Sequence, residues 1–350
     1  MTGVHPVDAL RRVAFLLERS SAPSFRVKAF RTAAAALARL DDDELARRAR
    51  GGSLTDLPGV GATTARIATE ALAGQVPAYL QRLEDEAAVL AEGGQELRAA
   101  LRGDLHVHSD WSDGGSPVEE MALTAVELGH DYIALTDHSP RLTVAHGLSP
   151  ERLAEQLDVV DRLNERLAPF RILSGIEVDI TEDGGLDQTE ELLGRLDVVV
   201  ASVHSRLRAD AAEMTRRMLG AVANPHTDVL GHCTGRLVAG PRSPRPESQF
   251  DADAVFAACA AHGVAVEINS RPERLDPPMR LLRRALDAGC LFAVDTDAHA
   301  PGQLDWQQIG AARAQEAGVP TDRVVNNWDA GRLLAWTGRH TQSGQGQPGG

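Results

Sequence analysis

The chain has 350 residues, 43% of them hydrophobic, and a formal net charge of −14. No apolar run approaches the roughly 20 residues that a membrane-spanning helix needs, and three widely spaced cysteines argue against a disulfide framework. We therefore expect a cytoplasmic protein with no membrane partner. The acidic balance does not favour broad nucleic-acid binding, although residues 1–100 carry equal numbers of basic and acidic side chains.

Residues 1–85 are predicted to form a small all-α domain. The segments 7–20 and 26–40 place apolar residues at helical spacing. A tight turn follows at "PGVG", residues 58–61, and a helix is expected over 62–73. Such a turn presents backbone N–H groups at a helix N-terminus, which can hold a phosphate, while plain packing of two helices is the alternative. Residues 86–102 are predicted to be an acidic linker.

Short β-branched strands alternate with helices over residues 103–337. This order predicts the α/β class, with a parallel barrel or an open parallel sheet. The Gly-, Gln- and Ser-rich residues 338–350 are expected to be a disordered tail. The seven expected strands are 103–108, 132–138, 171–178, 197–204, 228–233, 264–269 and 291–297.

Six of the seven expected strands end in a metal-capable side chain, and six of the 12 histidines fall there. The C-terminal ends of the strands form the active-site face of a parallel barrel. Because residues i and i+2 of a strand share a face, "HVH" and "DAH" can each bind one ion with two side chains. The candidate metal ligands are His106, His108, Asp113, His138, Glu177, His204, His232, Asp297 and His299, of which His106, His108, Glu177 and Asp297 are also the candidate catalytic residues.

Nine ligands exceed the four or so that a single zinc ion needs. We expect two or three divalent ions, Mn, Zn or Fe, with a carboxylate such as Glu177 bridging two of them. Asp137 is expected to orient a ligand rather than bind an ion. For the substrate phosphate the candidates are Ser205, Arg206, Arg236 and Arg274, and surface ion pairs are the alternative for these arginines.

The motifs "GDLHVHSDWSDG", "ALTDHS", "GIEVDI", "ASVHSR", "VLGHCTGRL" and "DTDAH" resemble the polymerase and histidinol phosphatase (PHP) family over about residues 103–335. The similarity is to the PHP domain of bacterial family X DNA polymerases in particular. The first 85 residues resemble the helix-hairpin-helix domain of those polymerases, through "FRVKAFRTAAAAL" and "LTDLPGVG".

This resemblance implies a distorted seven-stranded TIM-like barrel with a trinuclear metal centre. One ion would take His106, His108, Glu177 and Asp297, and Glu177 would bridge to a second ion on His204 and His232. The third ion would take Asp113, His138 and His299. The implied activity is that of a manganese-dependent 3'-5' exonuclease and phosphoesterase.

Two departures from the family limit this expectation. Residues 86–102 leave no room for a polymerase palm, so we expect no nucleotide polymerisation, although a separate DNA polymerase is a possible partner. The helix after the glycine turn contains no lysine for a Schiff base, which argues against lyase activity by that route. Lys28, the only lysine of the chain, lies in an earlier helix and is expected to contact the DNA backbone together with Gly59 and Gly61.

Three functions follow as hypotheses. The leading one is a metal-dependent phosphoesterase that processes DNA ends in repair. The second is a small-molecule phosphatase of the histidinol-phosphate type, which the acidic surface favours and a DNA-docking domain disfavours. The third is a non-enzymatic DNA-binding adaptor, against which the intact ligand set argues.

Overall fold

The computed structural model describes residues 4–240 and 243–338, and its chain divides into two compact units. The first unit contains the residues up to Val89 together with Pro301–Gln303, and the second contains the others. The expected linker is therefore divided, since residues 90–102 belong to the second unit. Leu97 and Leu101 explain this, because both are buried in the hydrophobic core of that unit. The predicted tail lies outside the described residues, except for its first position.

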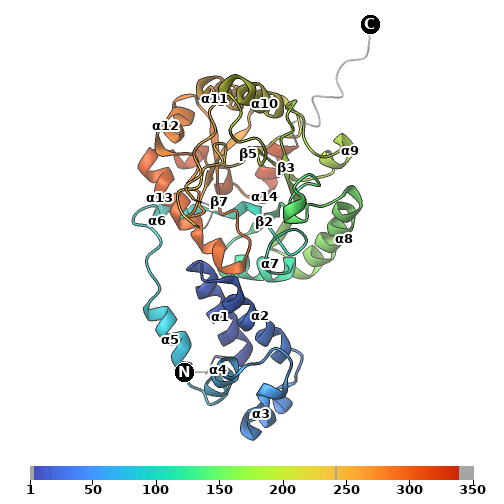
Figure 1. Ribbon diagram of the computed structural model, residues 1–350, viewed down its shortest axis with the longest axis vertical. Helices are drawn as coiled ribbons and strands as arrows, with labels where there is room; N and C mark the ends of the chain where they lie inside the picture. Colours follow the sequence, from blue (N-terminus) through green and yellow to red (C-terminus); the bar gives the residue numbers. More distant parts are fainter. Residues whose placement is uncertain (1–3, 241–242, 339–350) are drawn as a thin grey trace. The chain divides into compact units, whose positions relative to one another are not determined.

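The first unit is helical, which confirms the expectation from apolar spacing. The first helix begins at Pro6 and is capped by the side chain of His5, which accepts from the Val7 amide. The third helix is capped by the carboxylate of Asp41, which accepts from the Glu44 amide. Leu10, Leu17 and Leu37 lie in the core of the unit. The helices are α1 Pro6–Arg19, α2 Ser24–Leu37, α3 Asp42–Gly51, α4 Ala62–Leu72 and α5 Ala78–Asp85, with a 3-10 turn η1 Leu54–Asp56 (Figure 1).

The glycine turn between η1 and α4 is fixed by close packing. Gly59 has φ +85°, and a Cβ at this position would lie 2.4 Å from Cγ2 of Thr32. The Gly61 amide donates to the Thr64 hydroxyl at 3.0 Å, so a phosphate bound there would have to replace that hydrogen bond. Lys28 is exposed on α2.

Gly59→Ala should destabilise the first unit by about 2 kcal/mol, because it adds a steric overlap to the cost of a left-handed conformation. Hydrogen exchange of α2 and α4 amides in the full chain measures this loss. Gly74→Ala is the matched control, since Gly74 has a similar φ of +74° but open space around its Cβ position. Equal losses of protection in the two variants would contradict the packing argument.

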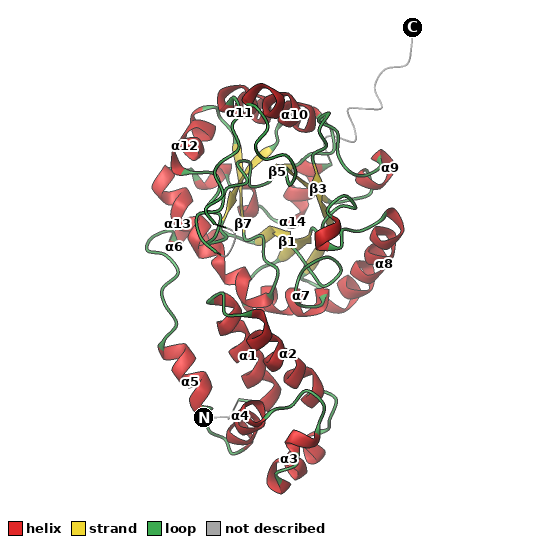
Figure 2. Ribbon diagram, viewed as in Figure 1, coloured by secondary structure: helices red, strands yellow, loops and turns green. Residues whose placement is uncertain are grey.

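The second unit is built on seven strands that are all parallel and lie in sequence order. Figure 2 shows these strands in the middle of the unit with helices around them. Each strand falls inside or within one residue of its expected range, and β5 is the shortest. The strands are β1 Gly103–Val107, β2 Tyr132–Leu135, β3 Arg171–Asp179, β4 Val198–Ser202, β5 Val229–Leu230, β6 Ala265–Asn269 and β7 Leu291–Asp295.

The sheet is nearly closed into a barrel. A parallel bridge joins Val107 to Ala298, and the His108 amide donates to the Ala298 carbonyl at 2.8 Å. The bridge links the end of β1 to the chain after β7. Of the two architectures that the sequence left open, the structure therefore adopts the barrel.

Helices cover the outside of the barrel. One hydrophobic cluster contains residues of all seven strands and the tryptophans 328 and 336, and the other clusters join strand residues to the surrounding helices. Alternate residues of a strand thus belong to the inner cluster and to the outer clusters, as expected of barrel strands. The helices are α6 Gln95–Ala100, α7 Val118–Glu127, α8 Pro150–Leu167, α9 Glu190–Leu193, α10 Ala211–Ala223, α11 Ala252–His262, α12 Met279–Asp287, α13 Gln307–Ala317 and α14 Ala330–Thr337, with 3-10 turns η2 Thr143–Ala145, η3 Pro301–Trp306, η4 Thr321–Arg323 and η5 Val325–Asn327.

Two further expectations concern membranes and thiols. Within the described residues, none of the helices has the length and apolar character that crossing a bilayer requires. All three cysteines are free and buried.

Candidate metal centre

The C-terminal ends of the strands bring the nine predicted ligands together. Their donor atoms form four overlapping groups, and within each group the atoms lie within 4.8 Å of one another. Parallel strands end at one edge of the barrel, which explains how residues nearly 200 positions apart meet. The groups are His108, Asp113, His138 and His299; His106, Glu177 and His232; His106, His108 and Asp297; and His138, Glu177 and His204.

Glu177 lies at the centre of the cluster. It is fully buried near the end of β3, and its two oxygens face five histidine rings. Oε1 lies 2.8 Å from Nε2 of His232 and 3.2 Å from Nε2 of His204. Oε2 lies 2.8 Å from Nδ1 of His138 and 3.4 Å from Nε2 of His106. This carboxylate is therefore placed to bridge two ions.

A second part of the cluster is centred on Asp113, in the loop after β1. Its Oδ1 lies 3.4 Å from Nε2 of His138 and 3.3 Å from Nε2 of His299. Asp113 is the most exposed of the nine, with 35% of its side chain accessible. The third predicted ion position therefore opens toward solvent.

The donor atoms of this cluster fit divalent cations. Both oxygens of Glu177 and Nε2 of His106, His204 and His232 are buried without a partner in hydrogen-bond geometry. Buried polar atoms in proteins are nearly always hydrogen-bonded, so a set of orphans that face one another indicates a missing ligand. Imidazole nitrogens and carboxylate oxygens together suit zinc, manganese and iron.

The electrostatics of the cluster agree with this assignment. Burial raises the pKa of Glu177, but His204, His106 and His138 outweigh it and hold the pKa well below its usual range. Burial lowers the pKa of His138, but Glu177 and Asp113 outweigh it and raise the pKa to about 10. Glu177 is therefore ionised, as a ligand of divalent cations must be, and a cation bound to His138 would displace the proton of that ring.

Asp297 is held in a strained position after β7. Its φ is +53°, which a residue other than glycine rarely adopts. Oδ1 lies 3.5 Å from Nε2 of His108, while Oδ2 accepts from Nε of Arg274 at 3.0 Å and from Nδ2 of Asn269 at 3.3 Å. Arg271 donates to the Asp297 carbonyl at 3.1 Å. Strain held by so many contacts is typical of functional sites.

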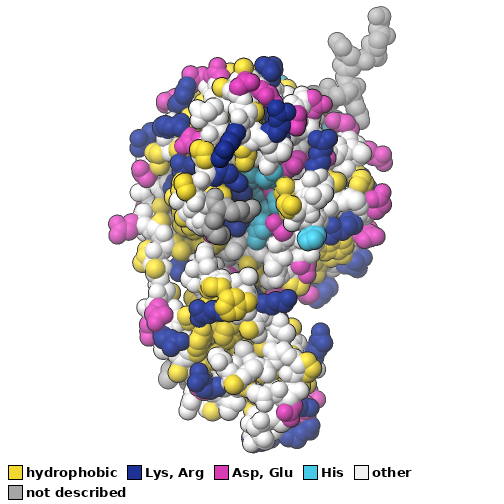
Figure 3. Space-filling view, viewed as in Figure 1, with side chains coloured by type: hydrophobic (Ala, Val, Ile, Leu, Met, Phe, Trp, Pro, Cys, Tyr) yellow, Lys and Arg dark blue, Asp and Glu magenta, His cyan; other side chains and the backbone are white. Residues whose placement is uncertain are grey.

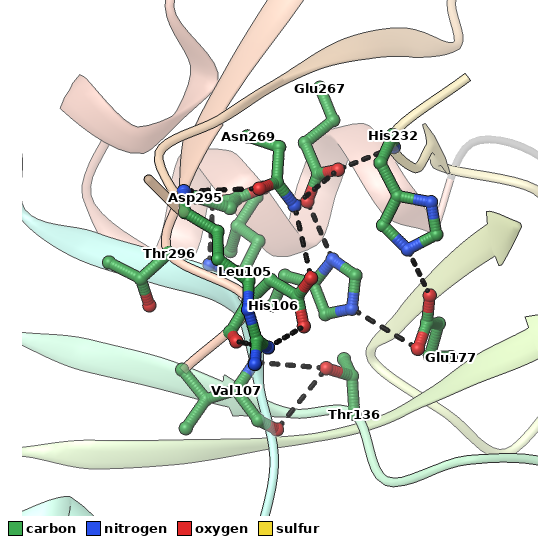
Figure 4. Close-up of polar contacts among 12 residues, drawn as sticks. Leu105, His106, Val107, Thr136, Glu177, His232, Glu267, Asn269, Asp295 and Thr296 are labelled. Atoms are coloured by element: carbon green, nitrogen blue, oxygen red, sulfur yellow. Dashed lines mark hydrogen bonds and ion pairs between the residues drawn. The ribbon is translucent and has the colours of Figure 1, made fainter. Parts of the chain in front are cut away.

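Two carboxylates behind the cluster were missed by the sequence reasoning. Glu267 on β6 accepts from Nδ1 of His106 at 2.6 Å and from the backbone amide of His232 at 2.5 Å (Figure 4). Asp179 on β3 lies 2.5 Å from Nδ1 of His204. Each hydrogen bond leaves the other ring nitrogen facing Glu177. In a strand, residues i and i+2 share a face, which pairs His106 with His108. The same rule places Asp179 on the face of Glu177, so the sequence contained the signal for Asp179.

Asp137 was expected to orient a ligand, and its carboxylate does so through the loop after β1, which carries Asp113. It accepts from the Ser109 amide at 2.8 Å, the Ser109 hydroxyl at 2.6 Å and Nε2 of Gln156 at 2.7 Å, and also from the Ser112 hydroxyl. Asp137 therefore helps to fix the loop that carries Asp113, together with backbone hydrogen bonds such as that from the Gly114 amide to the Ser109 carbonyl.

Asp137→Ala should lower the free energy of unfolding by about 3 kcal/mol, because it leaves several buried donors unsatisfied. Thermal and urea unfolding of the full chain test this expectation. Asp131→Ala is the control, since it breaks an exposed ion pair with Arg102 that is worth about 1 kcal/mol at most. A loss no larger than in the control would contradict this role.

A cavity of about 570 Å³ opens above the cluster. Figure 3 shows histidine side chains at the bottom of a hollow in this face, with arginine beside them. Five of the predicted ligands line the cavity, together with Arg245, Arg271 and Arg274.

Three of the predicted phosphate-binding residues are outside the described lining of this cavity. Arg206 pairs with Glu182 at 2.6 Å and with Glu213 at 3.2 Å. Nε of Arg236 donates to the Arg274 carbonyl at 3.0 Å. The Ser205 hydroxyl accepts from Arg217 at 3.1 Å. Of the four predicted phosphate-binding residues, Arg274 is the one that lines the cavity.

Comparison with known families gives two matches. Residues 104–271 match the PHP domain, and residues 1–76 match a helix-hairpin-helix domain. These ranges cover the strands that carry most of the cluster and the helices of the first unit.

Individual relatives agree with these matches. DNA polymerase/3'-5' exonuclease PolX of Bacillus subtilis is 38% identical over 248 residues, covering 68% of this chain and 43% of that protein. A protein of Syntrophotalea carbinolica named "Probable phosphatase" is 30% identical over 233 residues, covering 64% of this chain and 90% of that one. The chain thus spans less than half the length of the Bacillus relative. A solved histidinol phosphate phosphatase of Lactococcus lactis, with zinc, L-histidinol and phosphate, has a TM-score of 0.48 and 21% identity, covering 62% of this chain and 94% of that one.

Proposed function

The chain belongs to the PHP domain family of metal-dependent phosphoesterases, and on that premise we propose that it removes nucleotides from DNA 3' ends. The reaction is hydrolysis of a phosphodiester bond, and its proposed role is the processing of DNA ends in repair. The similarity to a 3'-5' exonuclease and the helix-hairpin-helix match at residues 1–76 support this substrate.

The observation that carries the proposal is the ring of unpartnered donor atoms around Glu177. A structural core does not leave so many buried polar atoms unsatisfied. We assign one ion to His106, His108, Glu177 and Asp297, a second to Glu177, His204 and His232, and a third to Asp113, His138 and His299. Manganese, zinc and iron all suit these donors.

The chain's own side chains complete the chemistry. Divalent ions held here would supply Lewis acidity and lower the pKa of water toward neutrality. Arg271 and Arg274 border the cavity with guanidinium groups that can bind phosphate oxygens. Glu267 and Asp179 hold the rings of His106 and His204 in place, so that one nitrogen of each ring faces Glu177. Polymerisation is not part of this proposal, because residues 86–102 leave no room for a polymerase palm between the helical segment and β1.

The first unit would dock the DNA backbone through Lys28 and the turn that contains Gly59 and Gly61. Lys28 is exposed, and helix N-termini attract phosphate. A separate DNA polymerase is a further proposed partner.

The test uses full-length protein stripped of metal and reloaded with Mn²⁺. DNA labelled at its 5' end should shorten stepwise from its 3' end, and His106→Ala should abolish this activity. Intact DNA after incubation with metal-loaded protein would overturn the proposal.

A small-molecule phosphatase is the second candidate, favoured by the relative named "Probable phosphatase", of which 90% is covered. Phosphate release from histidinol phosphate, with DNA left intact in the same preparation, would replace the first proposal by this one. An adaptor without activity would be indicated if neither substrate reacts although the metal content is complete.

A further inference from the structure

The cavity above the metal centre has two chemically different walls. One wall carries Arg245, Arg271 and Arg274, with Glu273 paired to Arg271 at 3.5 Å. The other is apolar and is formed by Leu142, Val144 and Ala145 of the segment after His138. The apolar residues Leu237 and Ala239 belong to the first wall, because Leu237 bridges Arg245 and the Ala239 amide donates to the Glu273 carbonyl. The floor contains the predicted ligands Asp113, His138, His204, Asp297 and His299. A substrate that fits both walls needs an anionic group at the floor and an apolar surface beside it.

Val144 is the most exposed of the large hydrophobic residues that the structure describes, with 86% of its surface accessible. It lies in the 3-10 turn η2, just after the ligand His138. A valine held in water beside a polar site gains nothing for the fold, whereas contact with a bound apolar group would bury it.

The segment that presents Val144 is rigidly held. The Leu148 amide donates to the His138 carbonyl at 2.7 Å, and Arg152 donates to the His146 carbonyl at 2.7 Å. At Gly147 a Cβ would lie 1.9 Å from the Ser139 carbonyl oxygen, so the turn is closed tightly on itself. The apolar wall therefore has a fixed position relative to the metal ligands, as a specificity surface requires.

We propose that this wall holds the nucleoside attached to the scissile phosphate, so that the site selects nucleoside phosphodiesters over esters of small polar alcohols. The inference rests on the proposed phosphoesterase function and specifies its substrate class. Every nucleobase has an apolar face that can pack on such a surface. The guanidinium groups of Arg245, Arg271 and Arg274 in the same lining suit a phosphodiester anion.

The size of the cavity suits one nucleotide at the metal centre. About 570 Å³ is within the range of pockets that enclose a single small molecule. The terminal nucleotide would therefore have to leave its base stack before it reaches the metal centre, as in other enzymes that act on one nucleotide in a pocket.

The experiment compares two diesters with the same leaving group. One is the p-nitrophenyl ester of thymidine 5'-phosphate, and the other is methyl p-nitrophenyl phosphate, in which methyl replaces the nucleoside. With full-length, Mn²⁺-loaded protein, kcat/KM should be at least about 10-fold higher for the nucleoside diester. Val144→Ser should lower kcat/KM for that diester by about 5- to 10-fold and leave the methyl diester within about twofold.

Val126→Ser is the matched control, because Val126 is a half-exposed valine of α7 that does not line the cavity. Neither diester should be affected by it. Equal rates for the two wild-type substrates, or an equal loss for both in Val144→Ser, would overturn the inference and leave the phosphoesterase function standing. Hydrolysis of neither diester by fully metal-loaded protein would remove the proposed function, and this inference with it.

Discussion

Glu177→Gln should reduce phosphodiester hydrolysis by at least about 10³-fold. The substitution keeps the size of the side chain but removes the negative charge that five histidine rings face. A neutral amide binds divalent cations weakly and cannot bridge two of them as a carboxylate does. We therefore expect the bound metal per chain to fall together with the activity.

The measurement combines kcat for a chromogenic phosphodiester with metal analysis of the purified variant. Glu182→Gln is the matched control, because Glu182 follows on the same segment but pairs with Arg206 at the surface. Circular dichroism shows whether the barrel remains folded. Full metal content with activity within about 10-fold of the wild type would show that Glu177 does not bridge the ions.

Glu267→Ala should weaken metal binding by about 10- to 100-fold. Glu267 accepts from Nδ1 of His106, which leaves Nε2 of that ring as the nitrogen that faces Glu177. Its second oxygen accepts from the His232 amide. One buried side chain thus positions two predicted ligands. Glu267→Gln keeps an oxygen acceptor, and should retain part of the affinity.

A titration of activity with metal shows whether Glu267 positions the metal ligands or has a purely structural role. The half-saturating Mn²⁺ concentration should rise in Glu267→Ala, while kcat at saturating Mn²⁺ should recover to within about 10-fold of the wild type. Asp228→Ala is the control, because Asp228 is also buried and accepts from the Val199 amide at the beginning of β4, at the opposite ends of the strands. If Glu267→Ala lowers stability as the control does but leaves the titration midpoint unchanged, Glu267 has no role in holding the ligands.

The ligand set could be predicted because it depends on short-range rules. A parallel strand places residues i and i+2 on one face, and all parallel strands end at the same edge. His106, His108, Glu177 and Asp297 therefore converge whatever the details of helix packing. Glu267 was missed because it lies two residues before the end of β6. Asp179 ends β3 two residues after Glu177, and was missed because the alternation was not extended to it.

These rules do not predict where the arginine side chains lie. A guanidinium group at the end of a long, flexible side chain goes where its partners are, and spacing along the chain does not determine that direction. Arg206 and Arg274 both follow strand ends, yet one pairs with Glu182 at the surface and the other with Asp297 at the centre. Arg245 lines the cavity from a loop that shows no apolar periodicity.

The sequence by itself determined the series of parallel strands, the edge that carries the chemistry and the residues that could hold metal, because strand spacing and alternation are local properties of the chain. Only the tertiary structure decided which ligands share an oxygen of Glu177, which arginines border the cavity and which apolar residues form its second wall. Those contacts join residues far apart in the chain, and their geometry is fixed by the packing of loops such as residues 139–148.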